Sequence, residues 1–375
     1  MMILNYEDKI AEAELLAKPV RSVPSTPFVH ADKLLIKGDN LDVMRFLLQN
    51  GYAGKIDLVY IDPPFATNNV FTIGEKRVST ISNSKDDRTA YSDNLTGSSF
   101  IEFIRQRLIL LRELMSENGS IYLHIDYKIG HYIKIIMDEV FGADNFRNDI
   151  TRIKCNPKNF SRKAYGNIKD LILFYSKGKS PVWNDPRLDL EEMDVLKRFC
   201  KISSDGRHYT TVPLHAPGET KNGPTGMMWK GMLPPEGRHW RSAPEELDRL
   251  DAEGLIEWSK TGNPRRIIFA DEKKSQGKKM QDVWTFKDYQ YPQYPTEKNL
   301  DLLEFIVNAS SSEDSIVLDC FCGSGTTLIA AEKLGRKWIG IDQSEEAIRV
   351  SEARLLEQMD IFTEKYDRYE FVKEE

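Results

Sequence analysis

Residues Val317–Thr327 read Val-Leu-Asp-Cys-Phe-Cys-Gly-Ser-Gly-Thr-Thr, an apolar run that continues through two glycines into a helical pattern. Glycines let a backbone approach a ligand closely, and a helix N-terminus presents unpaired N–H groups. The next apolar run ends at Asp342, 17 residues after Gly325, where a carboxylate can bind the two hydroxyls of a ribose. A triphosphate-binding loop requires a lysine after its glycines, and none is present here. Leu328 stands where the dinucleotide fingerprint has its third glycine. The stretch therefore indicates an adenosyl ligand without a pyrophosphate, with a ligand-free strand–helix turn as the alternative.

Short apolar runs lie on both sides of this turn, and helical patterns separate several of them. This alternation predicts an α/β fold with a mostly parallel, Rossmann-like sheet covered by helices on both faces. From about residue 182 to 287 the pattern breaks into short pieces punctuated by proline and glycine, which predicts an inserted module, and 66–97 looks like a long mobile loop. We therefore expect three segments, 30–180, 181–290 and 291–360. The predicted strands are 34–37, 57–61, 121–125, 171–175, 316–318 and 338–341, and the predicted helices are about 99–118, 297–308, 326–334 and 345–358.

The charge of the chain is uneven along its length. The net charge of −6 argues against a general polyanion binder, but 151–290 holds 26 Lys and Arg against 19 Asp and Glu. Basic side chains mixed with aromatic rings are suited to phosphate contact and base stacking. Lysine runs such as Lys278-Lys279 are also typical of solvated loops, which is the alternative. The same stretch holds five of the six tryptophans, Trp183, Trp229, Trp240, Trp258 and Trp284.

Cysteine and hydropathy patterns exclude several classes of protein. Four cysteines in 375 residues are too few and too scattered for a disulfide framework. No run of about 18 apolar residues occurs, and the N-terminus carries acids where a signal or transit peptide needs basic residues. We therefore expect a soluble, cytoplasmic protein with no membrane partner. Neither the cysteines nor the six histidines fall at zinc-ligand spacing, so we expect no metal site.

A second candidate site follows the apolar run 57–61, where Asp62, Pro63, Pro64 and Phe65 come in succession. The two prolines fix the backbone and remove two N–H donors, which leaves the Asp62 carboxylate and the Pro63 carbonyl as a rigid pair of acceptors. Such a pair fits an exocyclic amino group, with both N–H bonds accepted and the base stacked on Phe65. A strand-end turn capped by Asp62 is the alternative.

Together the two sites resemble those of the amino-methylating DNA methyltransferases that use S-adenosylmethionine. Their order is similar to that of the beta class, in which the Asp-Pro-Pro-Phe/Tyr motif comes first, a target-recognition region follows, and the Phe-x-Gly-x-Gly motif lies near the C-terminus. Here Phe321 follows Phe65 by 256 residues. Further stretches resemble the modification subunits of type III restriction systems and their solitary relatives, although the length fits a solitary enzyme or a type II partner better. These stretches are 91–94, 119–122, 237–241, 282–284 and 294–298.

The resemblance implies a role for each segment. Segment 30–180 would be the catalytic half of the methyltransferase domain, 181–290 the target-recognition insert, and 291–360 the half that binds S-adenosylmethionine. Asp62, Pro63, Pro64 and Phe65 would form the pocket for a flipped base. The residues implied in binding the cofactor are Asp39, Thr296, Lys298, Asp319, Phe321, Gly323, Ser324, Gly325 and Asp342.

Within this set the resemblance implies separate contacts. Asp342 would bind the ribose, Asp319 would lie near the amino group of the cofactor, and Asp39 would touch its adenine. A helix cap for Asp39 and a surface position for Lys298 are the alternatives. Members of the family often have proline where Cys320 stands, so this turn departs slightly from the pattern.

The resemblance also implies the reaction, a direct methyl transfer to the exocyclic nitrogen of a flipped base in double-stranded DNA. In this family Asp at the first motif position usually accompanies adenine N6 methylation and Ser accompanies cytosine N4 methylation, so Asp62 favours adenine. Cytosine-N4 methylation and a non-catalytic DNA-binding subunit stay open, whereas a nicotinamide-dependent oxidoreductase would leave the Asp-Pro-Pro-Phe motif unexplained. We expect Arg238, Trp240 and Arg241 to contact the DNA. A homodimer and a cognate restriction endonuclease are the further candidate partners.

Overall fold

The computed structural model describes residues 3–64, 70–74, 77–79, 88–92, 97–157, 163–188, 192–290, 297–358 and 366–373. Two predicted site residues, Phe65 and Thr296, lie outside these ranges, as do parts of the family-like stretches 91–94 and 294–298. The chain forms two compact units: unit 1 comprises Met1–Pro186 with Gln281–Glu375, and unit 2 is Arg187–Met280. Residues 281–290, which the sequence pattern placed in the insert, therefore belong to unit 1.

Unit 1 is built on a ten-stranded sheet. In spatial order its strands are β1 (Ser22–Pro24), β21 (Asp367–Lys373), β2 (Lys33–Lys37), β20 (Lys337–Asp342), β19 (Ile316–Asp319), β3 (Ile56–Ile61), β7 (Met115–Ile125), β9 (Lys169–Ser176), β8 (Phe146–Ile153) and β18 (Val283–Trp284). The strands from β21 to β7 are all parallel to one another, as are β8 and β18. Only the pairs β1·β21, β7·β9 and β8·β9 of this sheet are antiparallel. The prediction of an α/β fold with a mostly parallel sheet is confirmed.

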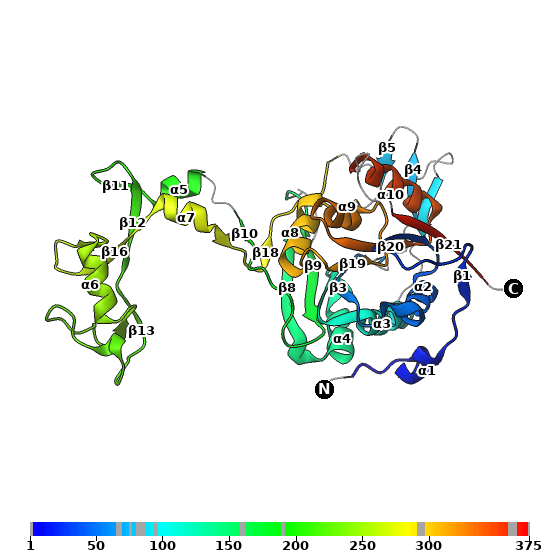
Figure 1. Ribbon diagram of the computed structural model, residues 1–375, viewed down its shortest axis with the longest axis horizontal. Coiled ribbons are helices and arrows are strands. Elements are labelled where there is room, and N and C mark those ends of the chain that lie inside the picture. The colour runs from blue at the N-terminus through cyan, green and yellow to red at the C-terminus, as the bar shows by residue number, and fades with distance from the viewer. Residues whose placement is uncertain are drawn as a thin grey trace. The chain divides into compact units, whose positions relative to one another are not determined.

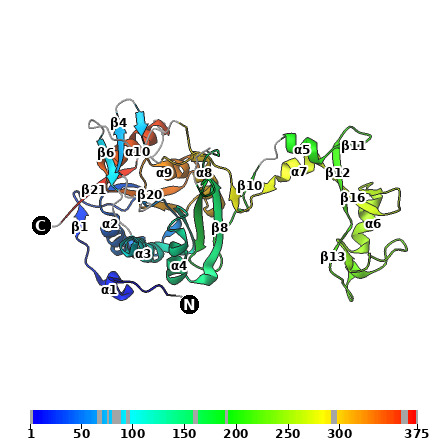
Figure 2. The ribbon, with the colours of Figure 1, turned by 180° about the vertical axis from the view of Figure 1, so that it is seen from behind.

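Helices cover both faces of this sheet (Figure 1). One face carries α2 (Asn40–Leu47), α3 (Gly97–Leu114) and α4 (Gly130–Phe141), and the other carries α8 (Leu300–Ser310), α9 (Thr326–Lys333) and α10 (Glu345–Gln358). The view from behind shows the same two layers (Figure 2). Near the N-terminus, α1 (Glu12–Ala17) packs against α3 and buries Leu15. Within the described ranges, no helix is long and apolar enough to cross a membrane.

Burial explains why the central strands appear in the sequence as apolar runs. In β3 the side chains of Ile56, Leu58, Val59 and Ile61 are fully buried, as expected for a parallel strand covered on both faces. The predicted helix 99–118 ends earlier, at Leu114, because the chain enters β7 at Met115. The Asn118-Gly119 pair, where the predicted helix would end, lies inside β7, where the register with β3 shifts.

The segment 66–97 contains strands where the sequence predicted a loop. β4 (Val70–Gly74), β5 (Arg77–Ser79) and β6 (Arg88–Ser92) pair in a small antiparallel sheet. Each strand holds β-branched or aromatic residues, which favour extended backbone, and the many polar residues between them concealed this pattern.

Unit 2 is a small module of antiparallel strands and short helices. Its core contains Leu214, Leu247 and Leu250 together with Trp229 and Trp240, all nearly fully buried. Its strands are β10 (Arg187–Leu188) with β17 (Lys278–Lys279), β13 (His215–Pro217) with β14 (Arg238–Trp240), and a four-stranded sheet of β11 (Lys201–Ile202), β12 (His208–Pro213), β16 (Pro264–Phe269) and β15 (Ile256–Trp258); its helices are α5 (Glu192–Arg198), α6 (Pro244–Ala252) and α7 (Ala270–Gln276).

Candidate functional site

The candidate site lies at the edge of the unit 1 sheet where parallel strands end. Asp39 follows β2, Asp342 ends β20, Asp319 ends β19 and Asp62 follows β3, so four predicted site residues stand at the carboxyl ends of neighbouring strands. From β19 the chain continues to β20 on one side, and from β3 it continues to β7 on the other, so the strand order reverses between β19 and β3. Open α/β sheets bind their ligands at the carboxyl edge beside such a reversal.

The turn between β19 and α9 depends on its two glycines. Gly323 and Gly325 have φ angles of 51° and 75°, a region that favours glycine. A Cβ atom on Gly325 would lie 2.8 Å from Oγ of Ser351 in α10, and that hydroxyl donates a hydrogen bond of 2.8 Å to the carbonyl oxygen of Gly323. The Gly323 N–H donates to Oδ2 of Asp342 at 2.9 Å. The structure therefore joins the glycine turn directly to the acid that ends the next strand.

A cation that sequence analysis missed supports this turn. Arg354 of α10 donates to Oγ of Ser324 at 2.9 Å and to its carbonyl oxygen at 2.8 Å, and it forms an ion pair of 2.9 Å with Glu297. Ser324 and Glu297 are both buried. No local sequence pattern identified the pair of Arg354 and Glu297. The two residues are far apart in the chain, and nothing in the sequence distinguishes Arg354 from an exposed charge of the same helix such as Arg349.

The acids that end β19 and β20 are hydrogen-bonded and largely removed from water. Asp319 accepts the N–H of Phe321 at 2.9 Å and the hydroxyl of Thr327 at 2.6 Å. Burial raises the pKa of Asp319 to about 7, and two neighbouring carboxylates act in the same direction. Burial also raises the pKa of Asp342, whose Oδ1 accepts the N–H of Ser344 at 2.8 Å. A ligand that brings a positive charge or hydroxyl donors would favour the ionised carboxylates.

Asp39 occupies the N-terminus of α2 and accepts N–H bonds from its first turn, as the helix-cap alternative describes. About half of its side chain, 48%, is exposed, so the same carboxylate is accessible to a ligand. The adjacent Asn40 donates to the Cys320 carbonyl oxygen at 2.8 Å and accepts a hydrogen bond of 2.7 Å from Nε of Arg107. This part of the edge is thereby tied to the start of the glycine turn.

Phe321 lies on the α3 side of the turn. Its ring centroid is 6.0 Å from that of Phe103, and the Arg107 guanidinium lies 3.5 Å from the centre of the Phe103 ring. Beside Phe103 and Arg107, a cavity of about 350 Å³ opens between α3 and the N-terminal segment around Asp8. The NH2 atom of the buried Arg107 lies 3.9 Å from Oδ2 of Asp39, so this ring and cation are next to Asp39.

Asp62 has two oxygens in different surroundings. Oδ2 forms an ion pair of 2.5 Å with Nζ of Lys298, whose side chain is only 12% exposed, so Lys298 is no simple surface lysine. Oδ1 is buried and has no hydrogen-bond partner among the residues that the structure describes. The Nδ1 atom of His124 is 3.9 Å from it, beyond hydrogen-bond distance. A buried acceptor without a donor is costly, which indicates that a ligand N–H completes this site.

A buried polar network supports Asp62 from inside the sheet. His124 of β7 is fully buried, and its Nδ1 lies 2.9 Å from the hydroxyl of Tyr60, while its Nε2 lies 3.3 Å from Oδ2 of Asp170 in β9. Asp170 also binds Nζ of Lys154 at 2.7 Å and lies 3.9 Å from NH1 of the buried Arg152. The sequence analysis did not select His124 or Asp170, although a histidine within the predicted apolar strand 121–125 was an available signal.

Burial and hydrogen bonds determine the protonation states of the residues in this network. Burial lowers the pKa of His124, which favours the neutral imidazole. Burial opposes the charge of Asp170, but hydrogen bonds and charges from His124 and Lys154 hold the pKa of this carboxyl below its ordinary value. Burial raises the pKa of Tyr60, so its hydroxyl keeps the proton. In the part of the chain that the structure describes, no group of three His, Cys, Asp or Glu residues is placed to hold a metal ion.

A family model described as DNA methylase, of the N6/N4 type, matches residues 56–353. The chain belongs to the N6/N4 family of DNA methyltransferases. It is 42% identical over 354 residues to the type II methyltransferase M.EcaI of Enterobacter cloacae, covering 91% of this chain and 75% of that protein. It is 28% identical to the type III restriction-modification enzyme StyLTI Mod subunit of Salmonella typhimurium, covering 82% of this chain and 51% of that protein. The resemblance seen in the motifs is confirmed.

Among solved structures, that of the M1.HpyAVI–SAM complex aligns with this methyltransferase at a TM-score of 0.45 and 17% sequence identity. The alignment covers 86% of this chain and 99% of that chain.

In unit 2 of the methyltransferase, one of the predicted DNA contacts, Trp240, lies in the core. Trp240 is 2% exposed, and its indole N–H donates to the Met227 carbonyl oxygen at 2.9 Å, so its ring cannot stack on a base in this conformation. Trp240 is a core residue that packs edge-on against Trp229. Arg238 and Arg241 are exposed, as a DNA contact requires. The aromatic content of the insert was therefore in part a signal of core packing.

The basic charge is also distributed differently from the interpretation that the sequence suggested. Unit 2, Arg187–Met280, holds 17 Lys and Arg against 15 Asp and Glu, which is nearly balanced. Residues 151–186 hold 8 Lys and Arg against 2 Asp and Glu, and they belong to unit 1. This stretch runs through the connection between β8 and β9, at the same sheet edge as Asp62, since β9 begins opposite the end of β7. Tyr165 in this connection is 97% exposed.

Proposed function

We propose that this methyltransferase transfers a methyl group from S-adenosylmethionine to the exocyclic N6 of an adenine flipped out of duplex DNA. The observation that carries the proposal is the buried Oδ1 of Asp62, which has no donor among the described residues and lies where the strand order reverses. An exocyclic amino group supplies the missing donor. Flipping is part of the proposal because the amino nitrogen of a paired base is held within the duplex.

The residues around the glycine turn fit S-adenosylmethionine, which supplies an electrophilic methyl group when bound. Each carboxylate oxygen of Asp342 accepts one backbone N–H and retains lone pairs for the ribose hydroxyls. Asp319, whose pKa is raised to about 7 by burial, gains a counterion from the amino group of the cofactor. The position of Gly325 leaves no room for a side chain, which is typical of a turn that a ligand approaches closely.

The mechanism follows from what surrounds Asp62. Oδ1 accepts one N–H of the target amino group and the Pro63 carbonyl accepts the other, which favours a pyramidal nitrogen whose lone pair points at the methyl group. Lys298 binds Oδ2 and thereby fixes the carboxylate and its charge. Catalysis then comes mainly from positioning and preorganised charge, without a covalent enzyme intermediate.

Adenine is the proposed base because Asp62 stands where the family pattern associates Asp with adenine and Ser with cytosine. The family comprises both N6 and N4 enzymes, so cytosine N4 is the second candidate.

We further propose that unit 2 is the target-recognition module, with Arg238 and Arg241 in contact with DNA. The named type II and type III relatives support a place in restriction-modification, and a cognate endonuclease, a homodimer and a cytoplasmic location are proposed on the same basis.

The decisive experiment expresses the chain in a methylation-deficient bacterial host and sequences the host genome by a single-molecule method that reports modified bases. The expected result is N6-methyladenine at nearly every copy of one short motif. N4-methylcytosine would overturn the choice of base and leave the family intact. A soluble protein that binds DNA but leaves every base unmodified would favour the non-catalytic subunit.

Asp62→Ala tests the catalytic assignment in the purified enzyme. We expect loss of methyl transfer by at least about 1,000-fold, with DNA and cofactor affinities close to those of the parent. The matched control is Asp301→Ala, which removes an exposed carboxylate from the first turn of α8 and should leave activity unchanged. An Asp62→Ala enzyme that methylates at the parent rate would contradict the assignment.

A further inference from the structure

The hydrogen bonds around His124 determine which ring nitrogen carries its proton. Oδ2 of Asp170 faces Nε2, and an ionised carboxylate only accepts hydrogen bonds, so Nε2 must carry the hydrogen. A neutral imidazole then has a bare Nδ1, which accepts the hydroxyl of Tyr60 at 2.9 Å. Lys154 and Arg152 are both within 4 Å of Asp170 and favour its ionised form. These contacts select a single tautomer.

That tautomer has a consequence for Asp62. The bare Nδ1 of His124 lies 3.9 Å from Oδ1 of Asp62 and offers it no hydrogen. In the opposite tautomer the same nitrogen would carry an N–H on the side where Tyr60 and Asp62 both lie. A small ring movement would then pair it with Oδ1, the oxygen that has no donor among the described residues.

We propose that Asp170 and His124 act as positioning residues that keep Oδ1 of Asp62 free of a protein donor, so that this oxygen is available to the amino group of the target base. The inference rests on the proposed function, in which Oδ1 accepts that amino group. Asp170 sets the tautomer of His124, and the imidazole fills the space beneath the carboxylate without competing for it. The pair touches neither cofactor nor base, and it acts only through Asp62.

Asp170→Asn is the variant that reverses the tautomer. Lys154 donates to Oδ1 of Asp170 at 2.7 Å, so the amide oxygen of the new Asn would keep this contact and its NH₂ group would face Nε2 of His124. Nε2 would become an acceptor and Nδ1 would carry the hydrogen; replacing an Asp that orients a histidine by Asn has this effect in hydrolase triads. We expect kcat to fall about 10- to 100-fold, the loss from one competing hydrogen bond to a charged group, with unchanged KM for the cofactor.

The matched control is Asp149→Asn on β8, which removes an exposed carboxylate from the strand next to β9 and should leave kcat unchanged.

The tautomer of His124 is measured directly by long-range ¹H–¹⁵N spectra of histidine-labelled enzyme. The signal of His124 among the six histidines is identified as the one that is lost in His124→Gln. Parent enzyme protonated at Nε2 and Asp170→Asn protonated at Nδ1 support the proposal. The parent protonated at Nδ1, or a folded Asp170→Asn with parental kcat, overturns it.

Two substitutions of His124 keep the proposal testable if Asp170→Asn does not fold. His124→Gln places an amide nitrogen near the position of Nε2, where it donates to Asp170 and leaves Asp62 alone. His124→Asn places its amide near the position of Nδ1, where it donates toward Asp62. We expect His124→Gln to retain kcat within about threefold and His124→Asn to lose about 10-fold or more at similar melting temperatures. Equal losses in the two variants would indicate a packing role and overturn the proposal.

These outcomes are separate from failure of the proposed function. If Asp62→Ala were active, the acceptor role of Asp62 would fail, and with it the reason to keep Oδ1 free. If Asp62→Ala were inactive while Asp170→Asn kept parental kcat, the acceptor role would stand and only the tautomer role would fail.

Discussion

The carboxyl edge of the unit 1 sheet and the tryptophan cluster of unit 2 place their chemically distinctive residues in opposite ways. At the edge, polar groups such as Asp319 and His124 are buried within hydrogen-bond networks beside the site. In unit 2 the aromatic residues Trp229 and Trp240 are buried and the basic residues Arg238 and Arg241 are outside. The first region therefore buries its polar groups beside the site, whereas the second buries its aromatic rings and exposes its charge.

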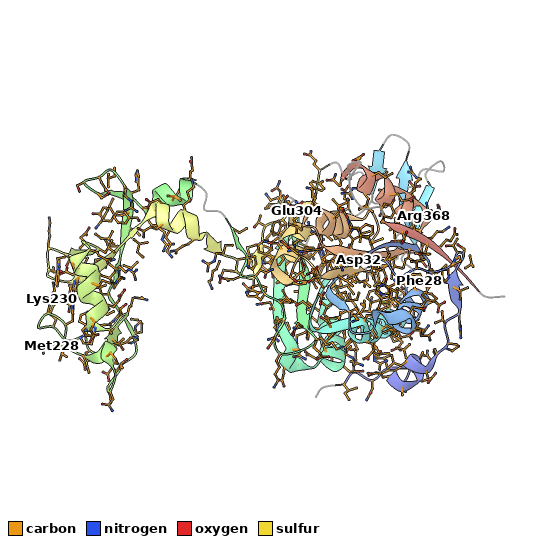
Figure 3. The ribbon with its side chains drawn as sticks, viewed as in Figure 1. Phe28, Asp32, Met228, Lys230, Glu304 and Arg368 are labelled. Atoms are coloured by element: carbon orange, nitrogen blue, oxygen red, sulfur yellow. The ribbon has the colours of Figure 1, made fainter. Side chains whose placement is uncertain are left out.

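The difference follows from how each region is built. Parallel strands bring their carboxyl ends to one line, so residues as distant in sequence as Asp62 and Asp319 must meet there. Unit 2 is organised instead around Trp229. Its ring stacks on that of Trp258 with the centroids 5.7 Å apart, and its indole N–H donates to Oδ1 of Asp248 at 2.8 Å. Next to it, Lys230 of the tight Trp229–Met232 turn lies beside α6 (Figure 3), where it pairs with Asp251. Substitutions that separate packing from charge test this comparison directly.

The largest effect is expected from Trp229→Ala. Removing a buried tryptophan costs about 3–5 kcal/mol in folded proteins, and here the loss includes its hydrogen bond to Asp248. Thermal unfolding should show a lower midpoint, and titration calorimetry should show weakened DNA binding with cofactor affinity retained, because the glycine turn belongs to unit 1. The control is Trp258→Ala, which removes a ring that is 42% exposed and should cost less. A Trp229→Ala enzyme as stable as the parent would remove the packing half of the comparison.

Gly325→Ala probes the opposite region. A side chain at a φ of 75° costs about 1–2 kcal/mol, and the added Cβ would also lie 2.8 Å from Oγ of Ser351. We expect cofactor affinity to fall about 10-fold or more while DNA affinity is kept. Gly335→Ala is the matched control, because Gly335 has a φ of 68° and a Cβ atom added there would meet nothing within 4 Å, so it carries the backbone cost alone. Equal cofactor affinities in the two variants would mean that the contact with Ser351 does not shape the site.

Arg238→Gln and Arg241→Gln test the exposed charge of unit 2. Each should weaken DNA binding about fivefold and reduce the slope of log affinity against log salt concentration by about 1, since each removes one phosphate contact. Cofactor affinity and melting temperature should stay the same. Arg249→Gln on α6 is the control, because Arg249 is also exposed but is already paired with Glu246 and Glu253. If all three variants lost the same affinity, the effect would be one of net charge and would not locate the DNA surface.

The sequence predicted the sheet and the positions of Asp62, Asp319 and Asp342 at or just after the ends of strands, because these depend on local patterns. Apolar runs mark buried parallel strands, and an acid directly after such a run must lie at the carboxyl edge. Partners from other elements were beyond this reasoning. Arg354 reaches Ser324 from a helix, and His124 meets Asp170 across two strands, and no spacing rule identifies such pairs.

Composition gave a less specific signal in unit 2, for a different physical reason. Tryptophan has a large apolar surface together with one N–H donor, so it suits a small core as well as a nucleic-acid surface, and composition cannot separate these uses. In unit 2 the large rings of Trp229 and Trp240 make up much of a small core. The basic excess assigned to the insert lay mainly in 151–186, because a count over 151–290 combined parts of two units.

The smallest predicted effect concerns the buried charge at the sheet edge. Burial raises the pKa of Asp319 to about 7, so in the cofactor-free enzyme this carboxyl is mostly protonated below pH 7. If the cationic amino group of S-adenosylmethionine binds beside it, the ionised form is favoured, a proton is released, and binding strengthens as the pH rises. For a pKa of 7, cofactor affinity should increase about twofold between pH 6.5 and 7.0, a range in which an α-amino group with a pKa of about 7.7–8.0 stays mostly protonated.

Titration calorimetry in two buffers of different ionisation enthalpy measures this proton directly. Close to one proton should be released per cofactor at pH 6, and Asp319→Asn should release none and bind with a pH-independent affinity over the same range. Asp205, an exposed acid of unit 2, serves as the contrast, because Asp205→Asn should leave both quantities unchanged. Cofactor binding by the parent without proton release would mean that the buried charge of unit 1 is balanced inside the protein and not by the ligand, and the contrast between the two regions would then lie in packing alone.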